Sequence, residues 1–155
     1  MKNERFKKTK KRHEQLVDVI NAAKISTEPP GSGSYQGTSS ESDNGDQDIK
    51  TKLHFAADGS ITGYGHDSAD GQYTIVDGAW AILGSNSQPT VVWTEKYRKG
   101  FHVLVRGIFE PDGTTIKAHF ASSKGVQGTF VLTPMLTPWE GTATRTAHRW
   151  QSEAH

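Results

Sequence analysis

The chain has 155 residues, a formal net charge of +1 and no cysteine. This length is typical of one domain with tails. The lack of cysteine excludes disulfides and thiolate metal sites and fits a reducing compartment. No apolar run approaches the ~20 residues that cross a bilayer, and the basic start lacks the apolar segment of a signal peptide. We therefore expect a soluble intracellular protein, with no organelle assigned.

Residues 1–28 predict a basic amphipathic helix, over residues 3–25, and its linker. Pro29 and Pro30 cannot continue a helix and therefore end it. Apolar side chains in the second half follow the i, i+3, i+4, i+7 spacing of one helix face, at Leu16, Val19, Ile20 and Ala23. This stripe packs either on the chain's own barrel or on another subunit.

Basic residues dominate the start of this helix. Seven of the first twelve residues are basic and one is acidic, a net charge of +6, so the remaining residues sum to −5. We call these twelve residues the basic arm. It is either a solvated helix end or a tether to an acidic protein, a nucleic acid or an anionic membrane surface. The side chains of residues 1–28 that we expect to contact a partner are Arg5, Lys7, Lys8, Lys10, Lys11, Arg12, Leu16, Val19 and Ile20.

Residues 31–133 predict a β-barrel domain. Short β-rich runs, the first at Ser34–Ser39, alternate with Asp-Gly and Lys-Gly pairs at close, regular spacing. These pairs suit tight hairpins because glycine accepts the positive φ of type I′ turns. Asp77-Gly78 is interpreted as one such turn, between the strands Tyr73–Val76 and Trp80–Leu83. The fold class expected is mainly β, an antiparallel up-and-down meander barrel of about eight or nine strands.

The alternation of side chains along each strand assigns the inside of the barrel. The inward sets are aromatic and aliphatic, which predicts a packed core with few polar groups. Glu95 is the one acid that we assign inward, and its place near a strand end predicts a solvated side chain at the rim. Gly63, Gly65 and Gly107 also point inward and leave room for a bulky neighbour, which we expect to be Trp93.

Two further features predict contacts outside the barrel. Val92, Leu104 and Ile108 point outward, and we expect the helix, the tail or a partner to cover them. Residues 134–155 predict an extended C-terminal tail that carries Trp139 and Trp150. These two rings either dock back on the barrel or bind a partner.

No motif predicts catalysis. The chain lacks a Walker sequence, a third glycine after Gly63-Tyr64-Gly65 and a Gly-Xaa-Ser-Xaa-Gly elbow. His54, His102 and His119 fall on outward faces, and we interpret them as surface histidines because no acid is placed to orient them as zinc ligands. We expect no catalytic residue, no metal, no cofactor and no enzymatic activity.

Two segments resemble the avidin/streptavidin family of up-and-down barrels. They are Asp58–Gly63, with the sequence DGSITG, and Thr90–Arg98, with the sequence TVVWTEKYR. Gly33-Ser34-Tyr35 is similar to that family's opening Gly-Thr-Trp, and the resemblance spans roughly Gly33 to Thr133. It implies an eight-stranded barrel that holds a biotin pocket.

The resemblance also implies site residues. Trp93 matches a family tryptophan that lines the ligand, and Phe120 stands in place of another tryptophan, so these two are the ligand-binding candidates. Gly65 stands where the family has a tyrosine that contacts the ligand. Phe101 and Val103 stand in place of its serine and threonine hydroxyls.

Our leading hypothesis is a non-enzymatic binding or assembly module. The barrel is then a rigid body, anchored in a larger protein complex through the basic helix and the tryptophan-bearing tail. One alternative is a small-ligand barrel of avidin or lipocalin type, although a small molecule is the less expected partner. Another is a nucleic-acid-associated protein that uses the basic arm for phosphate contacts.

Overall fold

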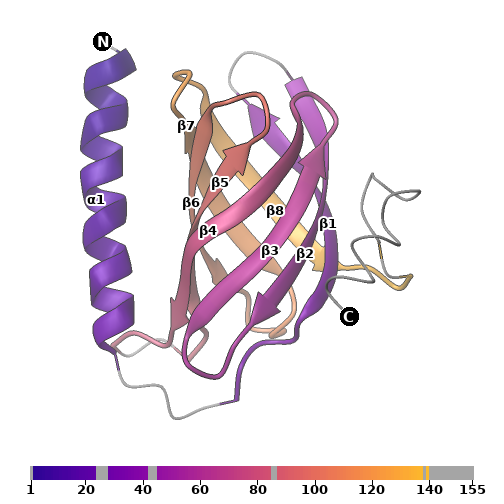
Figure 1. The fold of residues 1–155 in the computed structure, drawn as a ribbon. Coiled ribbons are helices and arrows are strands. Elements are labelled where there is room, and N and C mark those ends of the chain that lie inside the picture. The colour runs from indigo at the N-terminus through magenta and orange to yellow at the C-terminus, as the bar shows by residue number, and fades with distance from the viewer. Residues whose placement is uncertain (1, 24–27, 42–44, 85–86, 138, 140–155) are drawn as a thin grey trace.

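The computed structural model describes residues 2–23, 28–41, 45–84, 87–137 and 139. Within these ranges, one helix, α1 (Lys2–Ala22), precedes eight strands that form a closed antiparallel barrel (Figure 1). Each strand pairs with the next one in the sequence, which confirms the predicted up-and-down barrel. The strands are β1 (Gly33–Glu41), β2 (Gly45–Phe55), β3 (Ser60–Asp67), β4 (Gly71–Ala81), β5 (Thr90–Tyr97), β6 (His102–Phe109), β7 (Ile116–Ser122) and β8 (Gln127–Pro134).

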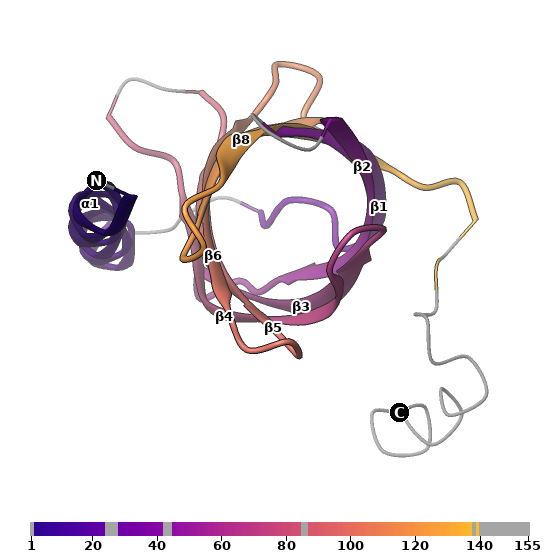
Figure 2. The ribbon, with the colours of Figure 1, turned by 90° about the horizontal axis from the view of Figure 1, so that it is seen from above.

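Strands β1 and β8 close the barrel, and glycines let their backbones approach each other. Gly37 of β1 pairs with Leu132 of β8, and a Cβ on Gly37 would lie 1.8 Å from the carbonyl oxygen of Val131. A Cβ on Gly128 of β8 would lie 1.9 Å from the carbonyl oxygen of Ser40. A side chain at either position would push the two strands apart. Figure 2 shows the closed cross-section from above.

The Asp77-Gly78 pair is a bulge within β4, and the prediction of a hairpin turn there was wrong. The pairing of β4 with β5 shifts register between Val76 and Ala79. Asp77 has a φ of 53°, and a Cβ on Gly78 would lie 2.4 Å from the carbonyl oxygen of Ile61. An Asp-Gly pair supplies the unusual backbone of a bulge as readily as that of a turn. The two predicted strands are therefore one.

The barrel interior is the main hydrophobic core, as the alternation predicted. Trp80, Trp93 and Phe109 are among its largest fully buried side chains. The prediction that Trp93 fills the space beside the inward glycines was wrong, because none of the atoms nearest to a Cβ on Gly63, Gly65 or Gly107 belongs to Trp93. Gly65 pairs with Tyr73 of β4, and a Cβ on Gly65 would lie 2.3 Å from the Tyr73 hydroxyl oxygen. The ring of Tyr73 therefore occupies this space.

Helix α1 packs on the chain's own barrel, the first of the two alternatives for its apolar stripe. Ile20 is 1% exposed and forms a second apolar cluster with Ala79, Ala81 and Val92 of the barrel. Val19 was assigned to the stripe but is 55% exposed, because the buried face includes Val17 and His13 instead. The helix lies beside the face formed by β4, β5, β6 and β7 (Figures 1 and 2).

The outward apolar patch is covered mainly by this helix. Val92 is fully buried in the α1 cluster, Leu104 is 6% exposed, and Ile108 is half-buried. The helix, one of the three covers expected for these side chains, is the cover of Val92. The helix is too polar to span a membrane, and the described ranges hold no other helix.

The two ends of the barrel differ. Residues 28–32 pass beneath the lower end in Figure 1, where the Tyr35 hydroxyl donates to the Gly31 carbonyl at 2.6 Å and the Phe55 amide donates to Ser32 Oγ at 2.9 Å. The β3–β4, β5–β6 and β7–β8 hairpins lie at the upper end. We call this upper end the mouth, and it holds the cavity described below.

Candidate functional site

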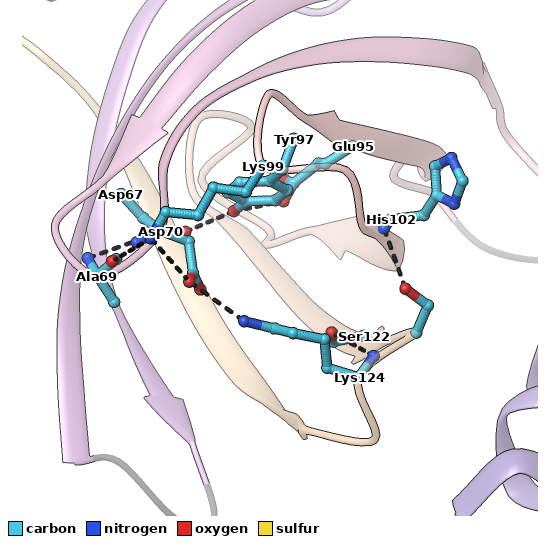
Figure 3. A network of polar contacts seen from close by, with 10 residues as sticks. Asp67, Ala69, Asp70, Glu95, Tyr97, Lys99, His102, Ser122 and Lys124 are labelled. Atoms are coloured by element: carbon cyan, nitrogen blue, oxygen red, sulfur yellow. Dashed lines mark hydrogen bonds and ion pairs between the residues drawn. The ribbon is translucent and has the colours of Figure 1, made fainter.

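The mouth of the barrel holds a small cavity of about 90 Å³. Carboxyl groups, hydroxyls and aromatic rings line it together, in contrast to the apolar interior that the sequence predicted. Its lining consists of Ser39, Ile49, Asp67, Ala69, Asp70, Glu95, Tyr97, Phe101, Val103, Phe120, Ser122, Lys124, Val126 and Phe130. Figure 3 shows the polar part of this set.

Glu95 of β5 lies on the inward face of the barrel and is 5% exposed. The prediction of a solvated rim residue was therefore wrong. Its Oε2 accepts a hydrogen bond of 3.0 Å from Nε1 of Trp93. Burial raises the pKa of Glu95 to about 7, and repulsion from Asp67 adds to this rise. A carboxyl group with this pKa exchanges its proton near neutral pH.

Tyr97 connects Glu95 to Asp67. Its hydroxyl donates to Asp67 Oδ2 at 2.5 Å and lies 3.3 Å from Glu95 Oε1. A phenol has one proton, so while Tyr97 donates to Asp67 it accepts from Glu95 only when Glu95 is protonated. Burial, followed by the charge of Glu95, raises the pKa of Tyr97, which keeps its hydroxyl protonated. The three side chains form one hydrogen-bonded chain.

Backbone amides hold Asp67, which lies at the end of this series of three hydrogen-bonded side chains. Oδ1 of Asp67 accepts hydrogen bonds from the backbone amides of Ala69, at 2.9 Å, and Asp70, at 2.5 Å. These two bonds hold the β3–β4 turn against the carboxylate. Asp67 is thus held in place as an acceptor at the wall of the cavity.

The rim of the mouth is linked by charges from three hairpins. Lys124 Nζ lies 3.2 Å from Asp70 Oδ1, and Lys99 Nζ lies 3.7 Å from the same atom. Lys124 Nζ also lies 4.0 Å from the centre of the Phe101 ring, which stacks on Tyr97 at 4.5 Å. Exposed ion pairs contribute only about 0–1 kcal/mol, so these contacts across the mouth add little stability.

The two ligand-binding candidates have different places. Phe120 lines the cavity and stacks on Phe130, with ring centres 6.1 Å apart. Trp93 is 1% exposed and does not line the cavity, but its indole N–H holds Glu95. Phe120 thus lies at the cavity itself, and Trp93 is linked to the cavity through its hydrogen bond to Glu95.

The residues predicted to contact a partner lie away from the mouth. Leu16 and Ile20 pack against the barrel of this chain, whereas Val19 is exposed. Trp139 packs beside Tyr64, with ring centres 5.7 Å apart, and its amide donates to Ser34 Oγ at 2.9 Å. Trp150 lies outside the described residues. The six basic side chains of α1 are exposed, namely Arg5, Lys7, Lys8, Lys10, Lys11 and Arg12.

The three outward histidines line separate grooves. His54 borders a groove beside Tyr64, His102 borders one flank of α1, and His119 borders the other flank. Within the described ranges, no group of three or more histidine, aspartate or glutamate side chains could hold a metal ion.

Sequence reasoning missed Asp67 although the signal was present. Gly63 and Gly65 were assigned inward on β3, and Asp67 follows them at the same spacing of two residues. Tyr97 lies two residues after Glu95 and so shares its inward face, and its register partner Tyr73 is buried beside it.

No protein-family model and no curated protein sequence matches this chain.

Proposed function

We propose that the chain is a non-enzymatic binding protein whose barrel mouth takes the cationic head group of a small molecule. A small-ligand barrel of avidin or lipocalin type was one of the alternatives that the sequence left open, and the geometry of the mouth favours a small ligand over an assembly module. The observation that carries it is the buried Glu95 carboxyl, hydrogen-bonded to Trp93 and Tyr97 beside a cavity. A buried acid that is costly to ionise gains most from a positive ligand.

Charge and shape support a cation. Glu95 and Asp67 together present two carboxyl groups to the cavity, and the rings of Phe101, Phe120 and Tyr97 supply aromatic faces that attract cations. Lys124 already places an ammonium 4.0 Å from the centre of the Phe101 ring at the rim. A ligand ammonium would meet the same kind of face deeper in the mouth.

Size restricts the ligand. A water molecule takes about 30 Å³ of liquid volume, so the cavity of about 90 Å³ accepts a group of few atoms. The rest of a larger ligand would extend past Lys124 and Asp70, whose exposed ion pair is weak enough to open. We therefore expect small organic amines to bind by their ammonium group.

An avidin-like identity is a finer proposal. The closed eight-stranded barrel and the Trp93 match support it. The mouth differs from what the resemblance implies, because the ring of Tyr73 occupies the space beside Gly65 and the carboxyl-bearing residues Asp67, Asp70 and Glu95 line the cavity. We expect a ligand opposite in charge to the biotin carboxylate.

A specific observation also favours the assembly hypothesis as a second candidate. α1 uses one face to pack on the barrel, and its six basic side chains are exposed to solvent. Val19 adds an apolar group, 55% exposed, on the solvent side. An acidic protein surface would complement this side of the helix.

Methylammonium is expected to shift the NMR signal of the Trp93 indole N–H in a saturable way. This N–H donates to Glu95, whereas the Trp80 indole donates to the Ala56 carbonyl near the opposite end of the barrel and serves as internal control. Binding requires ionised Glu95, whose pKa is about 7. Affinity should therefore be about tenfold higher at pH 8 than at pH 6.

Two controls make this titration decisive. Acetate should leave the Trp93 signal unchanged, and Glu95→Gln should abolish the response to methylammonium. Equal shifts of Trp80 and Trp93, or an unchanged response in Glu95→Gln, would contradict the proposal. A saturable response to acetate alone would show that the mouth prefers anions.

A further inference from the structure

A second cleft lies outside the barrel, between α1 and the strands β6, β7 and β8. Its volume is about 620 Å³, within the range of small-molecule sites. It lies on the outer surface, and Phe120 is the one residue of its lining that also lines the mouth cavity. Its lining consists of Thr9, Arg12, His13, Leu16, Leu104, Arg106, His119, Phe120, Ala121, Gln127, Gly128 and Thr129.

The ionisable side chains that line this cleft are all basic. Arg12 comes from α1, Arg106 from β6 and His119 from β7, and no acidic side chain of the described residues belongs to the lining. The cleft on the other flank of α1 differs, because Glu14, Asp18 and Asp77 line it beside its basic groups. Of the two clefts that flank α1, the one between α1 and β6, β7 and β8 is therefore the one lined by basic groups without acidic ones.

Strand register builds one wall of this cleft. Arg106 pairs with His119, and His119 pairs with Thr129, so the three side chains form a row across three strands. Arg12 on α1 faces the same cleft from the opposite wall. A ligand in the cleft thus meets an arginine from each side.

Neutral groups complete the site. Gln127 and Thr129 offer side-chain donors, while Leu16 and Leu104 supply apolar surface. Burial lowers the pKa of His13, so at neutral pH this ring lines the cleft without charge. The positive charge of the cleft comes chiefly from its two arginines.

We infer that this cleft binds a water-soluble phosphate ester, with Arg12 and Arg106 holding the phosphate and the apolar wall contacting the organic part. Guanidinium groups match phosphate oxygens by paired hydrogen bonds, which a single lysine cannot provide. A phosphate has enough oxygens to engage arginines on two walls at once. The volume accommodates an organic group of nucleoside size.

Calorimetric titration with adenosine monophosphate, and with adenosine as the matched ligand without phosphate, tests this inference on the full chain. We expect saturable binding of the monophosphate only. Arg12→Gln and Arg106→Gln should each weaken it about tenfold. Lys7 lies on α1 and Lys117 lies on β7, and neither residue lines the cleft. The charge-matched controls Lys7→Gln and Lys117→Gln each remove one positive charge outside the cleft. Each should change the affinity for the monophosphate less than about twofold.

Three results would overturn the inference. The first is no saturable binding of the monophosphate by the wild-type chain, with thermal midpoints showing all variants folded. The second is equal weakening by all four substitutions, or tighter binding of oligodeoxythymidine that all four weaken alike, since either indicates a diffuse basic surface. The third is arginine-dependent binding to phosphatidylcholine vesicles containing phosphatidic acid without binding of the soluble ester.

Discussion

Glu95→Gln is expected to stabilise the protein at pH 8 and to leave it nearly unchanged at pH 4.5. The folded protein holds the Glu95 carboxyl with a pKa of about 7, against 4.5 for an unperturbed glutamate. Between these values the folded state binds a proton that the unfolded state has lost, so wild-type stability falls as pH rises. The glutamine side chain of the variant has no proton to lose and retains an oxygen that can accept from Trp93.

The size of this effect follows from the same two pKa values. Above pH 7 the wild-type protein carries the full penalty for ionising a buried carboxyl, about 3 kcal/mol by the usual linkage. The difference in unfolding free energy between Glu95→Gln and wild type should therefore rise from near zero at pH 4.5 to about 3 kcal/mol at pH 8. Urea denaturation at several pH values measures it.

His13 also makes stability depend on pH, so Glu95→Gln must be compared with the wild-type protein at each pH. Burial lowers the pKa of His13 below 6.5, so its contribution to stability is present above that pH and is lost as pH falls. This trend is opposite to that of Glu95, but it is common to both proteins and cancels in the difference. A difference that stays constant from pH 4.5 to pH 8 would show that Glu95 titrates normally and would contradict the account.

Gly37→Ala is expected to open the seam between β1 and β8 and to cost more than about 3 kcal/mol. Its Cβ would lie 1.8 Å from the backbone oxygen of Val131, which cannot rotate away as a side chain could. The strands must separate, and their shared hydrogen bonds are then lost. Faster amide exchange of β1 and β8 than of β4 and β5 would locate the opening at the seam.

Gly31→Ala is the matched control for this substitution. A Cβ on Gly31 meets no atom within 4 Å, and the hydrogen bond that Gly31 accepts from Tyr35 uses only its backbone. We expect its effect to stay within about 0.5 kcal/mol. A Gly37→Ala protein with the wild-type denaturation midpoint would show that the seam is not tightly closed.

Local sequence patterns were sufficient to predict the barrel fold. Turn pairs and alternation act between neighbouring residues, so they predicted the meander and the inward position of Trp93. Asp77-Gly78 failed because a bulge and a turn need similar backbone freedom, and only the pairing of β4 with β5 tells them apart. The misassigned Val19 has a comparable cause, since the outline of the barrel decides which residues of α1 touch it.

The mouth was harder to predict because its chemistry comes from distant segments. Alternation correctly placed Glu95 inward, but its burial depends on the hairpins at the mouth. Two of these hairpins contact each other through Asp70 and Lys124, which are far apart in the sequence. Asp67 was within reach of the same alternation rule that placed Gly65. Its contact with Tyr97 still required the strand register, which the sequence does not reveal.

The most direct measurement is the pKa of Glu95 in the intact chain, from the pH dependence of its carboxyl ¹³C signal. We predict a midpoint of about 7, which falls when methylammonium is added because the cation favours the ionised form of Glu95. A midpoint near 4.5, unchanged by the amine, would contradict this prediction.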